Sequence, residues 1–100
     1  MVGDKWALLL LPQLAGGPKR NGELIRALDG VSQKMLTQTL REMERNGLVL
    51  RRDFQQVPPR VEYELTPLGR SLGKVVAALD RWVVANFYEV ERARATFDAQ

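Results

Sequence analysis

The chain has 100 residues, of which 45% are hydrophobic and 27% are charged, and it contains neither cysteine nor histidine. A chain of this length forms one small core, so a multidomain protein is excluded and little material remains for a deep, enclosed active site. The missing residue types remove disulfides, thiolate nucleophiles, the commonest general base and the commonest transition-metal ligands. We therefore expect no enzyme activity, no metal and no cofactor.

The positive charge is concentrated in the middle third of the chain. The net charge is +3; residues 31–60 carry six basic and three acidic side chains, whereas residues 61–100 carry five basic and six acidic ones. Such an excess of basic side chains favours binding of an anionic partner by the middle segment. The alternative is that these side chains are ordinary surface charges that face only solvent.

Two helices are predicted in the first third of the chain. The first covers Lys5–Ala15 with Asp4 as its capping residue, and Pro12 is expected to kink or loosen its last turn. The second covers residues 22–28 and has a weak start at Asn21-Gly22. The apolar residues at helical spacing on the first helix are Trp6, Leu9, Leu10 and Leu14.

The third predicted helix is opened by Ser32, whose hydroxyl can accept a backbone amide of the first turn, and it runs to Asn46. Its two faces differ. One carries Leu36, Leu40 and Met43 as an apolar stripe, and the other is polar with a basic excess. The polar face is formed by Gln33, Lys34, Thr37, Gln38, Arg41 and Arg45.

Two strands joined by a loop are predicted after the third helix. They cover Leu48–Asp53 and Arg60–Leu65, and the loop between them contains Pro58-Pro59. In the second strand three apolar residues alternate with Glu62 and Glu64, which predicts one buried and one solvated face.

A long final helix is predicted from Thr66-Pro67, a capping hydroxyl followed by proline at the first helical position. Apolar residues then recur every three or four positions over more than twenty residues, a length of over about 30 Å at 1.5 Å per residue. The preceding part of the chain cannot offer a core of that length, so we expect a second copy of the chain to cover the outer end. The expected dimer interface consists of Leu72, Val76, Leu79, Trp82, Val83 and Phe87.

The order of these elements predicts a winged helix-turn-helix, a mainly α fold with a small β hairpin (α+β) and a long C-terminal dimerisation helix. In that fold the third helix enters the major groove of DNA, where Gln and Arg can pair with base edges and short Ser and Thr side chains approach phosphate. Arginines on the hairpin would supply further cations for the backbone. The alternative is an amphipathic helix whose solvent face is basic by chance. The expected DNA-binding residues are Ser32, Gln33, Lys34, Thr37, Gln38, Arg41, Arg51, Arg52 and Arg60.

Several segments together form a pattern that is specific to one protein family. They are Lys5-Trp6, residues 17–20, residues 31–44 with Lys-Met-Leu-Thr-Gln at their core, and residues 57–69 with Pro-Pro-Arg-Val-Glu-Tyr. In these segments the sequence closely resembles the HxlR-type family of bacterial, MarR-like winged helix transcriptional regulators, and the resemblance covers most of the chain.

The resemblance implies a homodimer that binds a pseudo-palindromic DNA operator, with the serine-capped helix in the major groove and the hairpin as the wing. Such a protein is expected to act as a repressor in the bacterial cytoplasm, associated with the nucleoid through its DNA. Residues 1–66 would form the DNA-binding core, and residues 67–100 the C-terminal dimerisation helices of the same domain. A small-molecule effector of unknown identity is a further candidate partner, between the wing core and the dimer helices.

The sequence departs from the family at two points that bear on regulation. Relatives often carry a cysteine in a helix before Lys-Trp, and some sense oxidants through it, whereas this sequence contains no cysteine and a thiol switch is not expected. Gln55 and Gln56 replace a more usual proline and acid, which predicts a more mobile wing tip.

Other functions are compatible with the same residues. One is a winged helix used only for protein contacts, and another is a small carboxylate-dependent enzyme at the dimer seam. Glu62 and Glu64 could suggest a carboxylate pair, although a solvated strand edge explains them as well. Residues 69–74 resemble a phosphate loop but have three residues between the glycines rather than four, inside a predicted helix. The longest apolar run, residues 6–12, is far shorter than the roughly 20 residues of a membrane span, so a soluble protein is expected.

Overall fold

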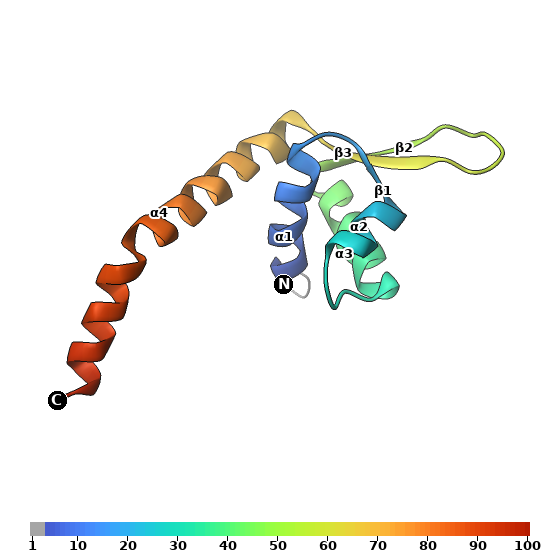
Figure 1. Ribbon diagram of the computed structural model, residues 1–100. Helices are drawn as coiled ribbons and strands as arrows, with labels where there is room; N and C mark the ends of the chain where they lie inside the picture. Colours follow the sequence, from blue (N-terminus) through green and yellow to red (C-terminus); the bar gives the residue numbers. More distant parts are fainter. Residues whose placement is uncertain (1–3) are drawn as a thin grey trace.

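Three short helices and a small sheet form a head, residues 4–66, from which one long helix extends (Figure 1). The computed structural model describes the backbone of residues 4–100 and the side chains from Lys5 onward; the capping role expected of the Asp4 side chain lies outside the described part. The elements are α1 (Asp4–Ala15), β1 (Lys19–Arg20), α2 (Asn21–Ala27), α3 (Gln33–Arg45), β2 (Val49–Asp53), β3 (Val61–Leu65) and α4 (Pro67–Asp98).

The mainly α fold with a small hairpin is confirmed, and two local expectations were wrong. The start of α2 is preceded by Arg20, whose backbone N–H donates to Glu23 Oε1 at 3.1 Å, so the helix is capped from Arg20 and not from Asn21-Gly22. On α1, Leu9 is 42% exposed whereas Leu11 is buried. α1 packs against α4 as well as against α3 and β3, so its buried side is wider than a single stripe and includes Leu11.

The core lies entirely within the head. α1, α2 and α3 surround it, and the first residue of β2 and the last residue of β3 close it from the sheet side. Thr39 is buried among these apolar side chains, and its hydroxyl donates to the Met35 carbonyl at 2.8 Å. The buried apolar residues are Leu10, Leu11, Leu14, Leu24, Leu28, Leu36, Leu40, Met43, Val49 and Leu65.

The sheet has three antiparallel strands in the order β1-β3-β2. β2 and β3 form the hairpin that the sequence predicts, with Val49 opposite Leu65 at the core end and Asp53 opposite Val61 at the outer end. The third strand, β1, was not predicted, because two residues are too short to show an alternating pattern. The hairpin, residues 49–65, is called the wing below.

The base of α4 is fixed to the corner between α3 and β2. The Thr66 hydroxyl accepts from Gly69 N at 3.0 Å, as expected for a helix cap, and also donates to the Gly47 carbonyl. The Thr66 amide donates to the Leu48 carbonyl at 3.1 Å. A Cβ added at Gly69 would lie 2.0 Å from that carbonyl oxygen, so only glycine allows this close approach.

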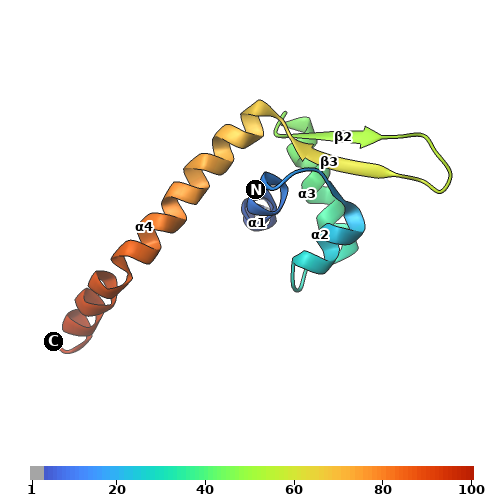
Figure 2. The same ribbon diagram turned by 45° about the horizontal axis from the view of Figure 1, so that its top comes forward.

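α4 and the wing project from opposite sides of the head (Figures 1 and 2). The chain therefore measures 64 × 27 × 22 Å and has a radius of gyration of 17.1 Å, against about 13 Å for a compact domain of this length. Beyond Val76 no residue of α4 is buried against the head. Within the described residues, no helix combines the length and the apolar character that crossing a membrane requires.

Candidate nucleic-acid interface

α3 is held rigidly by its apolar side. The Ser32 hydroxyl accepts from Met35 N at 3.1 Å, so the predicted N-cap is confirmed, and Gly47 adopts the positive φ of 75° that ends the helix. Leu36, Leu40 and Met43 are buried in the core. A helix fixed on one side presents its other side in a constant orientation.

The opposite side of α3 is exposed and polar. Gln33, Lys34, Thr37, Gln38, Arg41 and Arg45 are all exposed, as the periodicity predicted. Gln33 Nε2 donates to Thr37 Oγ1 at 3.1 Å, so these two side chains hold each other across one helical turn. The face combines amide, hydroxyl and guanidinium groups, which are the groups that pair with base edges and phosphates in the major groove.

The wing arginines are less free than the sequence suggested. Arg52 Nη2 lies 2.6 Å from Glu64 Oε1, and Arg60 donates from Nε and Nη2 to Glu62 Oε2 at 3.3 and 3.0 Å. The Arg60 guanidinium also lies over the Phe54 ring, 4.5 Å from its centroid. Among the side chains of residues 5–100, Arg51 makes no ion pair. Within this described part of the chain, Arg51 is thus the one cation without a carboxylate partner among the three expected on the wing.

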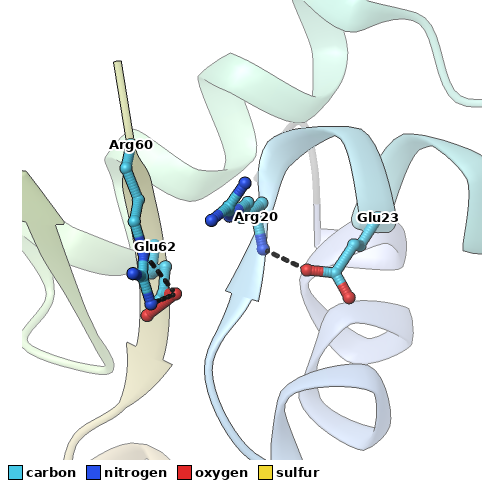
Figure 3. A network of polar contacts seen from close by, with 4 residues as sticks. All are labelled: Arg20, Glu23, Arg60 and Glu62. Carbon is cyan, nitrogen blue, oxygen red and sulfur yellow. Dashed lines mark hydrogen bonds and ion pairs between the residues drawn. The ribbon is translucent and has the colours of Figure 1, made fainter. Parts of the chain in front are cut away.

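β1 adds a cation that the sequence did not single out. Arg20 is exposed and pairs in register with Glu62 on β3. Figure 3 shows its side chain extending toward the strand that carries Arg60 and Glu62, while Glu23 accepts from its backbone amide. The only sequence signal was the Lys-Arg pair before α2, which carries no structural pattern of its own.

Glu62 and Glu64 act as partners of arginines, and their side chains are only 18% and 22% exposed. The space that they line together with Pro18 and Arg52 has a volume of about 10 Å³, room for roughly one water molecule. Within the described residues no group of three or more acidic side chains could hold a metal ion. In this structure the two carboxylates therefore serve as ion-pair partners of Arg52 and Arg60.

The comparison with known families identifies the fold. A family model described as HxlR-like helix-turn-helix matches residues 1–91, about nine-tenths of the chain. The chain belongs to the HxlR-like helix-turn-helix family. It is therefore a transcriptional regulator with a helix-turn-helix DNA-binding domain, in a winged-helix fold, and the resemblance seen in the sequence is confirmed.

Individual HxlR-like relatives agree with this assignment. The chain is 50% identical over 82 residues to the uncharacterized HTH-type transcriptional regulator YkvN of Bacillus subtilis (strain 168), a match that covers 82% of this chain and 70% of the relative. A solved structure described as a MarR-family transcriptional regulator from Enterococcus faecalis V583 is 48% identical, with a TM-score of 0.78 over 93% of this chain and 83% of that one. The redox regulator HypR, solved in its reduced form, is 40% identical, with a TM-score of 0.82 over 91% and 90% of the two chains.

α4 of this HxlR-like protein carries large apolar side chains that the head does not cover. Leu79, Trp82, Val83 and Phe87 are 50% to 60% exposed, and Leu72 is 37% exposed. Val76 differs from the other residues expected at a dimer interface, because it packs partly against the head's own core. The uncovered stripe is therefore centred on the four residues from Leu79 to Phe87. An apolar surface of this extent marks an interaction site.

Proposed function

We propose that the chain is a homodimeric repressor that binds a pseudo-palindromic operator. The observation that carries this proposal is the polar outer face of α3, which is presented by a helix whose other face is locked into the core. In the proposed complex α3 lies in the major groove, and the wing lies along the flanking backbone.

The residues of α3 take different roles in this complex. Gln38 and Arg41 lie in the middle of the exposed face and are proposed to read base edges, since Gln suits adenine and Arg suits guanine. The residues nearer the start of the helix, namely Ser32, Gln33, Lys34 and Thr37, position α3 on the backbone. On the wing Arg51 binds phosphate directly, while Arg52 and Arg60 contribute as arginines held by carboxylates.

The shape of α4 supports the proposed homodimer. Its apolar stripe projects away from the head, and a second copy offers the same stripe in return, as a two-fold interface requires. In this dimer the two α3 helices must lie about 34 Å apart to enter successive major grooves on one side of the DNA. Residues 4–66 then act as the reading unit and residues 67–100 as the dimerisation unit of one domain.

In the proposed mechanism the protein represses by occlusion. A dimer bound over a promoter blocks access of the polymerase, and no additional surface for contacting the polymerase is needed.

Recovery of bound DNA from a random pool tests the proposal. The expected product is a two-fold related sequence, whose binding weakens steeply between about 50 and 200 mM salt because phosphate contacts release counterions. Recovery of no sequence, or binding without a salt dependence, would favour a winged helix used only for protein contacts.

A further inference from the structure

The outer part of α4 follows a seven-residue repeat. Its first row of apolar residues corresponds to the a positions of a coiled coil and spans about 31 Å of helix at 1.5 Å per residue. The first residue of this row, Val76, also packs partly against the head, so the repeat begins where α4 leaves the head. In parallel coiled coils, β-branched residues at a together with leucine at d favour two strands. The row consists of Val76, Val83, Val90 and Phe97.

A second row lies between these residues, at the d positions. It begins with two leucines, as expected for two parallel strands, but its third member is Asn86, in line with Leu79. An amide inside an apolar seam is costly unless it is hydrogen bonded. A polar residue at one core position can, however, fix the register and the number of strands of a coiled coil. The second row consists of Leu72, Leu79, Asn86 and Ala93.

The Asn86 side chain has hydrogen-bonding groups left for a partner. Its Nδ2 donates to the Trp82 carbonyl at 2.8 Å, which is its one hydrogen bond among the described residues. An amide side chain has two N–H donors and one acceptor oxygen, so one N–H and Oδ1 remain. In a parallel two-fold pair each d residue meets its own copy, and the remaining N–H of one Asn86 can donate to Oδ1 of the other. A shift by one heptad would place Asn86 against Leu79 or Ala93 and leave both amides unpaired.

The residues that flank the seam favour the same arrangement. In a parallel pair the g position of one heptad faces the e position of the next heptad on the other helix, which places Glu89 opposite the partner's Arg94. Within residues 5–100 Glu89 makes no ion pair, and Arg94 has only a loose contact with Glu91, at 3.6 Å. In an antiparallel pair g faces g, and no g position of the repeat carries a cation. The g residues are Val75, Trp82, Glu89 and Thr96.

We propose that residues 76–97 form one strand of a parallel, in-register, two-stranded coiled coil, and that Asn86 selects a second copy of this chain as the partner. The choice of a second copy rests on the proposed function, whereas the orientation, the register and the role of Asn86 go beyond it. A helix with an apolar residue opposite Asn86 leaves the amide unpaired. α4 therefore discriminates against similar apolar helices of other proteins.

The parallel orientation also determines where the two heads lie. Both are at the same end of the coil, because each head is attached to the start of its own α4. The two-fold axis of the coil then passes between the two α3 helices. It can coincide with the two-fold axis of a pseudo-palindromic operator, as the proposed DNA complex requires.

The orientation is tested by cysteine cross-linking of the full chain, which contains no cysteine of its own. Leu79→Cys and Ala93→Cys change d positions equally far from Asn86, one on each side. On mild oxidation each variant should form a disulfide with its own copy. A mixture of the two, in which one variant carries a mass tag and subunits exchange before oxidation, should give no mixed disulfide. Tyr88→Cys, on the opposite side of α4, is the control and should remain unlinked.

The cross-linking results can overturn the proposal in two ways. An antiparallel pair centred on Asn86 would give the mixed disulfide of Leu79→Cys with Ala93→Cys and no disulfide of either variant with itself. Cross-linking of Tyr88→Cys as fast as Ala93→Cys would show that the heptad seam is not the contact surface. Ala93→Cys is a small change, so this variant tests the seam even if Leu79→Cys weakens the dimer.

The role of Asn86 is tested by Asn86→Leu mixed with the wild type. The homodimer of the variant should melt at a higher temperature, because the polar residue fixes register at a cost in stability. Mixed dimers contain one unpaired amide and should form at least about fivefold less often than random mixing gives. Val84→Leu, an exposed position outside the seam, is the control and should mix randomly with the wild type. Native mass spectrometry measures the shares, and random mixing of Asn86→Leu would overturn the role of Asn86.

These outcomes are distinct from a failure of the proposed function. A dimer that binds its operator but gives the mixed disulfide, or mixes randomly with Asn86→Leu, loses this proposal and keeps the proposed function. A wild-type chain that is monomeric, with Ala93→Cys unlinked after oxidation, loses both.

Discussion

The head and α4 both carry large apolar side chains at helical spacing, but they bury these side chains to different extents. In the head Leu10, Leu36 and Leu40 are at most 1% exposed, whereas on α4 Leu79, Trp82 and Phe87 remain at least half exposed. The head therefore satisfies its apolar residues within one chain, and α4 does not. This contrast supports the proposal made above, in which the head is a self-contained reading unit and a second chain covers the apolar side chains of α4.

The most severe test of this comparison removes the two large aromatic anchors from α4. Trp82→Ala with Phe87→Ala should abolish operator binding although no DNA-facing residue changes, because each loss costs about 3 to 5 kcal/mol if the ring is fully buried in a dimer. Fluorescence anisotropy with a labelled operator measures the effect. The control is Val84→Ala with Tyr88→Ala, which removes exposed side chains from the other side of α4 and should leave binding nearly unchanged. Normal operator binding by the Trp82→Ala, Phe87→Ala variant would show that the apolar stripe of α4 is not needed for DNA binding.

The junction between the two regions is tested by a pair of glycines. Gly69→Ala should destabilise the protein by about 1 to 3 kcal/mol, because the added methyl group overlaps the Leu48 carbonyl oxygen and the helix must move. Gly73→Ala, one turn later, should be neutral or stabilising by up to about 1 kcal/mol. Urea denaturation of both variants measures the difference. Equal stabilities would mean that α4 is not anchored at this corner.

Within the head, the roles of the α3 residues can be separated by sequence specificity. Gln38→Ala and Arg41→Ala should each weaken binding to the preferred operator by about 1 to 3 kcal/mol and change binding to random DNA much less, because base contacts are lost. Arg92→Ala on α4 provides the matched control for the loss of a cation. An equal loss of affinity for the operator and for random DNA would show that these two residues contact only the DNA backbone.

The wing gives a smaller and non-specific effect. Arg51→Ala should weaken binding to all sequences alike and lower the salt slope by about one unit, since this arginine has no carboxylate partner among the described side chains. Arg60→Ala should lower the slope less, because Glu62 already compensates its charge. The slopes are read from binding curves at several salt concentrations. An unchanged salt slope in both variants would show that the wing arginines do not contact DNA phosphates.

The smallest expected effect concerns oxidants and pH. The chain contains no cysteine and no histidine, so operator affinity should be insensitive to thiol-specific electrophiles and show no transition between about pH 6 and 8. Binding curves measured before and after treatment with diamide provide the check. Rapid release of DNA on treatment would show a sensing chemistry other than a thiol.

Local signals explain how much of the fold could be predicted from the sequence. Ser32, Gly47 and Thr66 act through the backbone next to them, and the helix ends that they predict are where the structure places them. β1 could not be predicted, because its two residues gain their strand geometry only from β3, more than forty positions later. The burial of Leu11 in place of Leu9 likewise depends on elements that pack from two sides.

The candidate site likewise has one part that could be predicted from the sequence and one part that could not. The exposed face of α3 follows from helical periodicity, so its residues could be named from the sequence. The pairing of Arg52 with Glu64 depends on the register of two strands, and sequence spacing does not fix that register.

The most direct test of the account is the mass of the wild-type protein in solution. Sedimentation equilibrium at micromolar concentration should give about 22.6 kDa, twice the chain mass of 11.3 kDa, because two α4 stripes cover each other. The mass should stay constant on dilution through the micromolar range. A species of 11.3 kDa that binds the selected operator normally would contradict the claim that α4 joins two reading heads.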